Sequence, residues 1–79
     1  MSIIKSPDHY AKWAIEPIVF IMGNGMSFWR GNVIKYVVRA GSKHYVGMTQ
    51  DESEITDLKK ARRYIDMRLN QLEGKAIND

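Results

Sequence analysis

The segment "DESEITDLKKARRYIDMRLNQL", residues 51–72, decides the fold of this 79-residue chain. Its apolar residues recur at spacings of three and four, the pattern of one face of an α-helix. They are Ile55, Leu58, Ala61, Ile65, Leu69 and Leu72. Asp51 to Ser53 supply a cap and first-turn acids, and Gly74 ends the helix. The segment therefore predicts a long amphipathic helix over about 52–73.

Two shorter helices are predicted before it. The first covers 15–23, with Pro17 in its first turn and "GNG" as its stop; its β-forming residues leave a strand as the alternative. The second covers 28–40, with Ser27 as N-cap and Gly41 as C-terminal stop. Residues 1–14 form an N-terminal segment containing a turn, and residues 74–79 a flexible tail. We expect a single all-α domain of three helices over residues 1–79.

Size and composition add expectations about partners. A chain of this length is near the lower limit for a self-sufficient core, and it has no cysteine with which to form a disulfide. We therefore expect a homo-oligomer. The net charge of +3 and pI near 9.3 favour an anionic partner. The apolar run "IVFIM" is too short for a signal peptide or a membrane span, so we expect a cytoplasmic protein.

The helix predicted over 28–40 carries a narrow polar stripe. Asn32, Lys35 and Arg39 lie on one side of it, at about 100° per residue, and Lys43 follows its end. A solvated stripe on a packed helix is one interpretation. The stripe contains no acid, however, and converging cations with an amide suit an oxygen-rich anion such as phosphate. We expect the stripe to face a polar cavity shared with His9 or Asp57, with a phosphate favoured over a protein carboxylate as its partner.

Other polar residues are weaker candidates on pattern alone. His9 and Tyr10 lie in the N-terminal segment, and Asp57 and Lys60 lie early in the long helix. The alternative for all four is an ordinary surface or packing role. The sequence has no phosphate-binding loop motif and no metal-ligand spacing, so no protein metal site is predicted.

Four blocks of the sequence resemble a family of small bacteriophage proteins of unknown function, related to the nucleotide kinases of podophages. The blocks are "PDHY" at 7–10, "IEPI" at 15–18, "GNVIKYVVRAGSK" at 31–43 and "DLKKARRYID" at 57–66. Pro17 and a longer loop before the last helix depart from the family pattern. The resemblance implies a nucleotide or phosphate site built from the polar members of the blocks, and the cytoplasm of an infected bacterium as the location. Those members are His9, Tyr10, Asn32, Lys35, Arg39, Lys43, Asp57 and Lys60.

Three functions follow from these patterns. In the first, Tyr10, Asn32 and the cations bind a nucleotide, while His9 or Asp57 assists a hydroxyl or a Mg²⁺ ion in a kinase-like reaction. In the second, the protein is a non-enzymatic phage effector that binds and inhibits a host protein through exposed anchors. Those anchors are Trp13, Trp29, Tyr45 and Met48. In the third, which the sequence favours least, "KKARRYIDMR" binds DNA.

Overall fold

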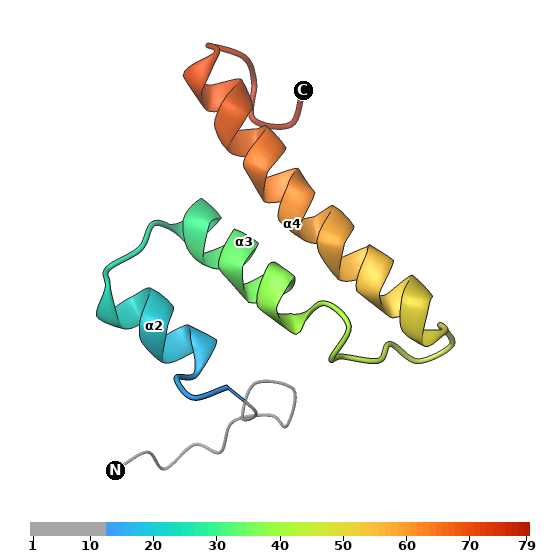
Figure 1. Cartoon of the computed structure of the whole chain (residues 1–79). Helices are drawn as coiled ribbons and strands as arrows, with labels where there is room; N and C mark the ends of the chain where they lie inside the picture. Colours follow the sequence, from blue (N-terminus) through green and yellow to red (C-terminus); the bar gives the residue numbers. More distant parts are fainter. Residues whose placement is uncertain (1–12) are drawn as a thin grey trace.

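The computed structural model describes residues 13–79 and contains three helices there. They are α2 (Pro17–Gly23), α3 (Phe28–Arg39) and α4 (Gln50–Leu72) (Figure 1). This part of the chain has no strand, which confirms the all-α prediction and makes the strand alternative for 15–23 wrong. No helix within residues 13–79 is long and apolar enough to cross a membrane.

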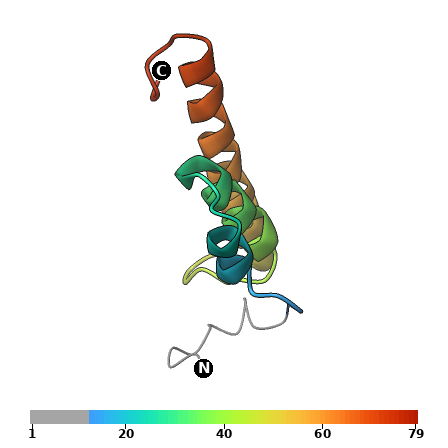
Figure 2. The same ribbon diagram turned by 90° about the vertical axis from the view of Figure 1, so that its left-hand side faces the viewer.

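The three helices lie side by side in a single layer. Helices α3 and α4 run antiparallel, and α2 lies on the side of α3 away from α4 (Figure 1). Turned by 90°, the helices line up one behind another (Figure 2). A second layer is the usual way to cover the apolar sides of helices, and nothing among residues 13–79 provides one.

The start of α4 differs from the prediction. Its N-cap is Thr49, whose hydroxyl accepts a hydrogen bond from the Glu52 amide at 3.1 Å, while the Glu52 carboxylate accepts from the Thr49 amide at 2.8 Å. This reciprocal capping box sets the helix start. Asp51 and Glu52 are first-turn acids as expected, but Ser53 is fully buried and plays no part in the cap. The cap predicted at 51–53 was therefore placed too late in the chain.

Two glycines in α3 and after it have clear structural reasons. A Cβ on Gly31 would lie 2.7 Å from Cγ2 of Ile21, so the absence of a side chain lets α2 approach α3 closely. Gly41 has φ +84°, a left-handed conformation that favours glycine and ends α3 as predicted.

Little apolar surface is fully covered. Among the described residues, the buried apolar side chains are Pro17 and Ala61, and the buried polar side chains are Arg39, Ser53 and Asp57. Leu58, which belongs to the predicted apolar face of α4, is 44% exposed. The predicted periodicity is present, but apart from Ala61 the members of that face have no neighbour among the three helices.

Candidate functional site

A buried ion pair joins α3 to α4. Nη2 of Arg39, on the last turn of α3, lies 3.1 Å from Oδ1 of Asp57 on α4. Their side chains are 8% and 0% exposed. A guanidinium and a carboxylate out of water are tolerated only when each faces the other and both are hydrogen-bonded. The pair therefore fixes α3 against α4 at this point.

Tyr45 completes the buried pair from the loop between α3 and α4. Its hydroxyl donates to Oδ1 of Asp57 at 2.6 Å and accepts from Nη2 of Arg39 at 2.7 Å and from Nζ of Lys60 at 3.1 Å. One donated and two accepted bonds exhaust the capacity of a phenol. The Tyr45 backbone amide also donates to the buried Ser53 hydroxyl at 3.0 Å. The loop is thus held at two points on α4.

Three lysines surround the rings of two tyrosines, Tyr36 on α3 and Tyr45. Nζ of Lys35 lies 5.1 Å from the Tyr36 ring centre, Nζ of Lys43 lies 5.0 Å from the Tyr45 ring centre, and Nζ of Lys60 lies 5.4 and 4.8 Å from the two centres. These are cation–π distances. We call these five residues the basic cluster. All five side chains are half-buried, so the cluster carries three positive charges close to the buried pair.

Hydrogen bonding within the basic cluster changes the acidity of Lys60. The bond from its ammonium group to the Tyr45 hydroxyl raises the pKa of Lys60 above its ordinary value of 10.5, against a smaller opposing effect of burial. The folded chain therefore holds this proton more tightly than the unfolded chain does. The resulting stabilisation is present below pH 10.5 and is lost as the pH rises through the folded pKa.

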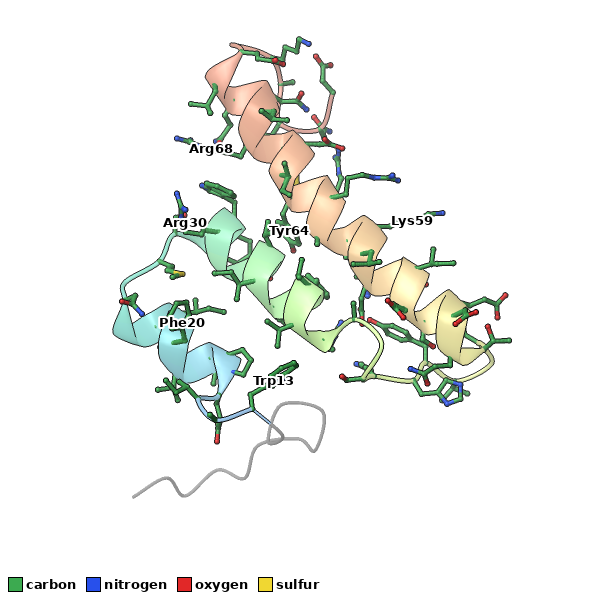
Figure 3. The ribbon with its side chains drawn as sticks, in the orientation of Figure 1. Trp13, Phe20, Arg30, Lys59, Tyr64 and Arg68 are labelled. Carbon is green, nitrogen blue, oxygen red and sulfur yellow. The ribbon has the colours of Figure 1, made fainter. Side chains whose placement is uncertain are left out.

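We expect Tyr45→Phe to bring the pKa of Lys60 back toward its ordinary value, because the variant keeps the ring and removes the hydroxyl. An NMR titration of the lysine Cε signals between neutral and strongly alkaline pH measures this. Lys59, exposed on the far side of α4 in Figure 3, provides the internal control. An unchanged Lys60 titration in the variant would show that the hydroxyl is not the cause.

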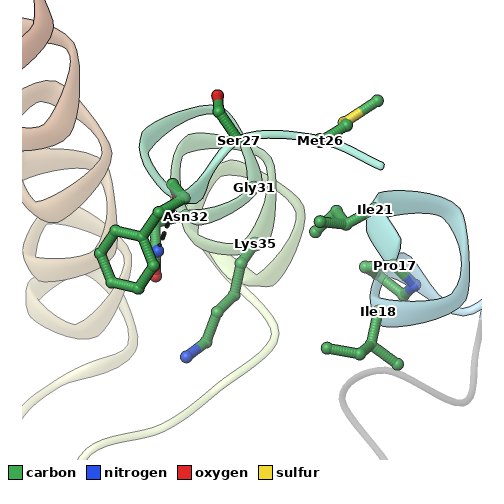
Figure 4. A pocket seen from close by; sticks show the side chains of 9 residues that line it. Pro17, Ile18, Ile21, Met26, Ser27, Gly31, Asn32 and Lys35 are labelled. Atoms are coloured by element: carbon green, nitrogen blue, oxygen red, sulfur yellow. Dashed lines mark hydrogen bonds between the residues drawn. The ribbon is translucent and has the colours of Figure 1, made fainter. Parts of the chain in front are cut away.

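A pocket of about 440 Å³ opens between α2 and α3 beside the basic cluster. Its walls are mostly apolar, with Pro17, Ile18 and Ile21 on α2, and its polar groups include Asn32 and Lys35 on α3 (Figure 4). The Asn32 amide donates to the Phe28 carbonyl at 2.8 Å, which holds its side chain along α3. Lys35 belongs both to this pocket and to the basic cluster.

The predicted stripe is therefore divided between two places. Arg39 turns inward to Asp57, so its partner is a protein carboxylate, while Asn32 and Lys35 line the pocket. Lys43 and Lys60 lie with Lys35 around the two tyrosines. His9 and Tyr10 lie outside the described residues.

Sequence reasoning missed three members of this site, Tyr36, Tyr45 and Ser53. Tyr36 directly follows Lys35 inside the "GNVIKYVVRAGSK" block, and that position was a usable signal. It stacks on Tyr64 with ring centres 6.0 Å apart, and Tyr64 lies between α3 and α4 (Figure 3). Tyr45 was considered only as an exposed anchor, but it is half-buried.

The catalytic role predicted for His9 and Asp57 stays a prediction. Asp57 is enclosed by Arg39 and Tyr45, which gives it a structural role between α3 and α4. Within residues 13–79, no group of three or more His, Cys, Asp or Glu side chains is arranged to hold a metal ion.

Comparison with known proteins gives one match. No curated protein and no solved structure shows significant similarity to the chain. Residues 4–66 match DUF3310, described as a family of proteins of unknown function. The matched range contains the ion pair, the basic cluster and the pocket. The chain therefore belongs to the DUF3310 family.

Proposed function

We propose that the protein binds a phosphate-bearing ligand of the nucleotide class at the basic cluster. The observation that carries this proposal is the convergence of Lys35, Lys43 and Lys60 on two tyrosine rings. Within residues 13–79, Asp57 is the carboxylate that forms hydrogen bonds beside the cluster, and its bonds go to Arg39 and Tyr45 and not to a lysine. The lysine charges are thus left for an external anion, and ammonium groups suit phosphate oxygens.

The pocket beside Lys35 supports an organic phosphate over the inorganic ion. Its volume of about 440 Å³ lies within the range of small-molecule sites, and its apolar walls with a few polar groups are typical of them. A ligand with its phosphate on the lysines and its base in the pocket would use both. Asn32, whose amide nitrogen is already bonded to Phe28, would offer its amide oxygen to the base.

We further propose that the bound nucleotide takes part in a kinase-like reaction. The resemblance to phage nucleotide kinases supports this. Phosphoryl transfer depends on positioning and on charge neutralisation, which the lysines would supply. Asp57 would contribute by holding Arg39 and Tyr45 in place. His9 and a nucleotide-bound Mg²⁺ remain candidates for assisting a hydroxyl. The reaction would take place in the cytoplasm of the infected bacterium.

A thermal-shift screen tests the proposal. Purified protein is heated with nucleoside mono- and triphosphates, each with and without Mg²⁺, and with inorganic phosphate and duplex DNA as comparisons. A ligand that binds only the folded chain raises the melting temperature. We expect at least one nucleotide to give a concentration-dependent rise larger than that given by phosphate. No rise with any nucleotide at millimolar concentration would contradict the proposal.

A second candidate, the host-protein effector, is favoured by the exposed apolar side chains of α2. Ile18, Val19 and Met22 are 55%, 57% and 73% exposed. Of the predicted anchors, Trp13 and Met48 are exposed, whereas Trp29 and Tyr45 are half-buried. Two results together would favour this candidate. One is a nucleotide screen with no thermal shift, and the other is binding of a host protein that is unchanged when the lysines of the basic cluster are replaced by glutamine.

A further inference from the structure

Most of the apolar face of α4 is left uncovered by the three-helix layer, and we call this uncovered part the apolar stripe. Its members are 41–67% exposed. They are Ile55, Leu58, Ile65, Leu69 and Leu72. At about 100° per residue, the stripe lies about 100° round the helix from Ser53, Asp57 and Ala61, whereas Lys60 lies about 60° to the other side. The stripe and the basic cluster are therefore on opposite faces of the layer.

The spacing of the stripe is that of a coiled-coil seam. Alternating steps of three and four residues place its members at the two core positions of a seven-residue repeat. One position holds Ile55, Arg62 and Leu69, and the other holds Leu58, Ile65 and Leu72. A single surface helix does not need this repeat, but two helices that pack along their length do.

We infer that a second copy of the chain covers this stripe, with its α4 packed antiparallel on the first. The isologous contact would place Ile55 opposite Leu72 and Leu58 opposite Leu69 of the second copy. Arg62, the single charged residue in the seam, decides the direction. A parallel in-register pair would place the two Arg62 side chains against each other. The antiparallel pair instead places Arg62 opposite Ile65, one residue from the Asp66 carboxylate of the second copy.

Charges beside the seam agree with this direction. Lys59 and Asp66 lie along one edge of the stripe, and both are exposed. Antiparallel packing pairs like edges, so Lys59 of each copy would face Asp66 of the other and form two symmetric ion pairs. The dimer adds the second layer that α3 and α4 lack, and it leaves the basic cluster open. This inference is independent of the proposed function.

The absence of cysteine from the chain allows a direct test. The variants Leu58→Cys and Leu69→Cys place a thiol at two exposed positions of the seam, and Arg63→Cys places one on the opposite face as a control. Each is oxidised alone, and Leu58→Cys is also oxidised with mass-tagged Leu69→Cys. We expect the mixture to give a disulfide-linked pair at a yield at least tenfold above either variant alone or the control. Circular dichroism checks that each variant is folded.

Two results would overturn the inference. One is a monomeric mass for the wild-type chain in light scattering at tens of micromolar. The other is efficient cross-linking of Leu58→Cys or Leu69→Cys alone, because same-residue contacts require a parallel pair.

Discussion

Replacing Asp57 with alanine is expected to lower the free energy of unfolding by about 3–5 kcal/mol, because it removes the carboxylate that faces the buried Arg39 guanidinium. Asp57 is fully buried and accepts hydrogen bonds from both Arg39 and Tyr45. A small domain has a total stability of about 5–15 kcal/mol. The change is therefore a large part of the total, and urea unfolding followed by circular dichroism measures it.

A double-mutant cycle separates the ion pair from other effects of the substitution. Arg39→Ala alone should cost about 2–4 kcal/mol, and the double variant should be more stable than the sum of the two single losses predicts. Arg63→Ala, an exposed position on the same helix, is the control and should change stability by less than about 0.5 kcal/mol. Additive losses at Arg39 and Asp57 would contradict an energetic link between them.

Neutralising two lysines of the basic cluster is expected to weaken nucleotide binding by about 100-fold. In Lys35→Gln/Lys60→Gln, two charge-assisted hydrogen bonds of about 1.5 kcal/mol each are lost. Both side chains are half-buried beside Tyr36 and are less screened by solvent than surface charges. Isothermal titration calorimetry with the nucleotide that gives the largest thermal shift measures the change.

The control for this variant has the same net charge. Arg63→Gln/Lys75→Gln removes two cations from exposed positions outside the cluster. We expect it to bind within about threefold of the wild type, which corresponds to less than 1 kcal/mol. If both double variants weaken nucleotide binding equally, binding depends on net charge alone, and the proposed site at the basic cluster is wrong.

Much of the fold could be predicted because the helices are encoded locally. Three local features predict the helices without knowledge of tertiary contacts. They are the three-and-four spacing in α4, Pro17 in the first turn of α2 and Gly41 after α3. The same periodicity could not show which apolar faces are covered. Leu58 repeats with the right spacing, but whether it is covered depends on the number of helix layers, and residues 13–79 of one chain form a single layer.

The candidate site could be predicted only in part, because it depends on contacts between residues far apart in the sequence. Helical geometry correctly places Lys35 and Arg39 on one side of α3. The burial of Arg39 depends on Asp57 of α4, whose Oδ1 lies 3.1 Å from Nη2 of Arg39. Tyr45 was harder to foresee, because it lies in an irregular loop. Its position depends on its hydrogen bonds to Ser53 and Asp57, both of which lie on α4. Long-range contacts of this kind leave no periodic trace in the sequence.

An NMR titration of the isotope-labelled wild-type protein with a nucleoside monophosphate tests directly whether the basic cluster binds nucleotides. We expect saturable shift changes at all five residues of the basic cluster and at the pocket residue Asn32. The buried Arg39 should retain its contact with Asp57 throughout. Changes confined to the exposed cations of α4, such as Arg62 and Arg63, or no saturable change at millimolar nucleotide, would contradict nucleotide binding at the basic cluster.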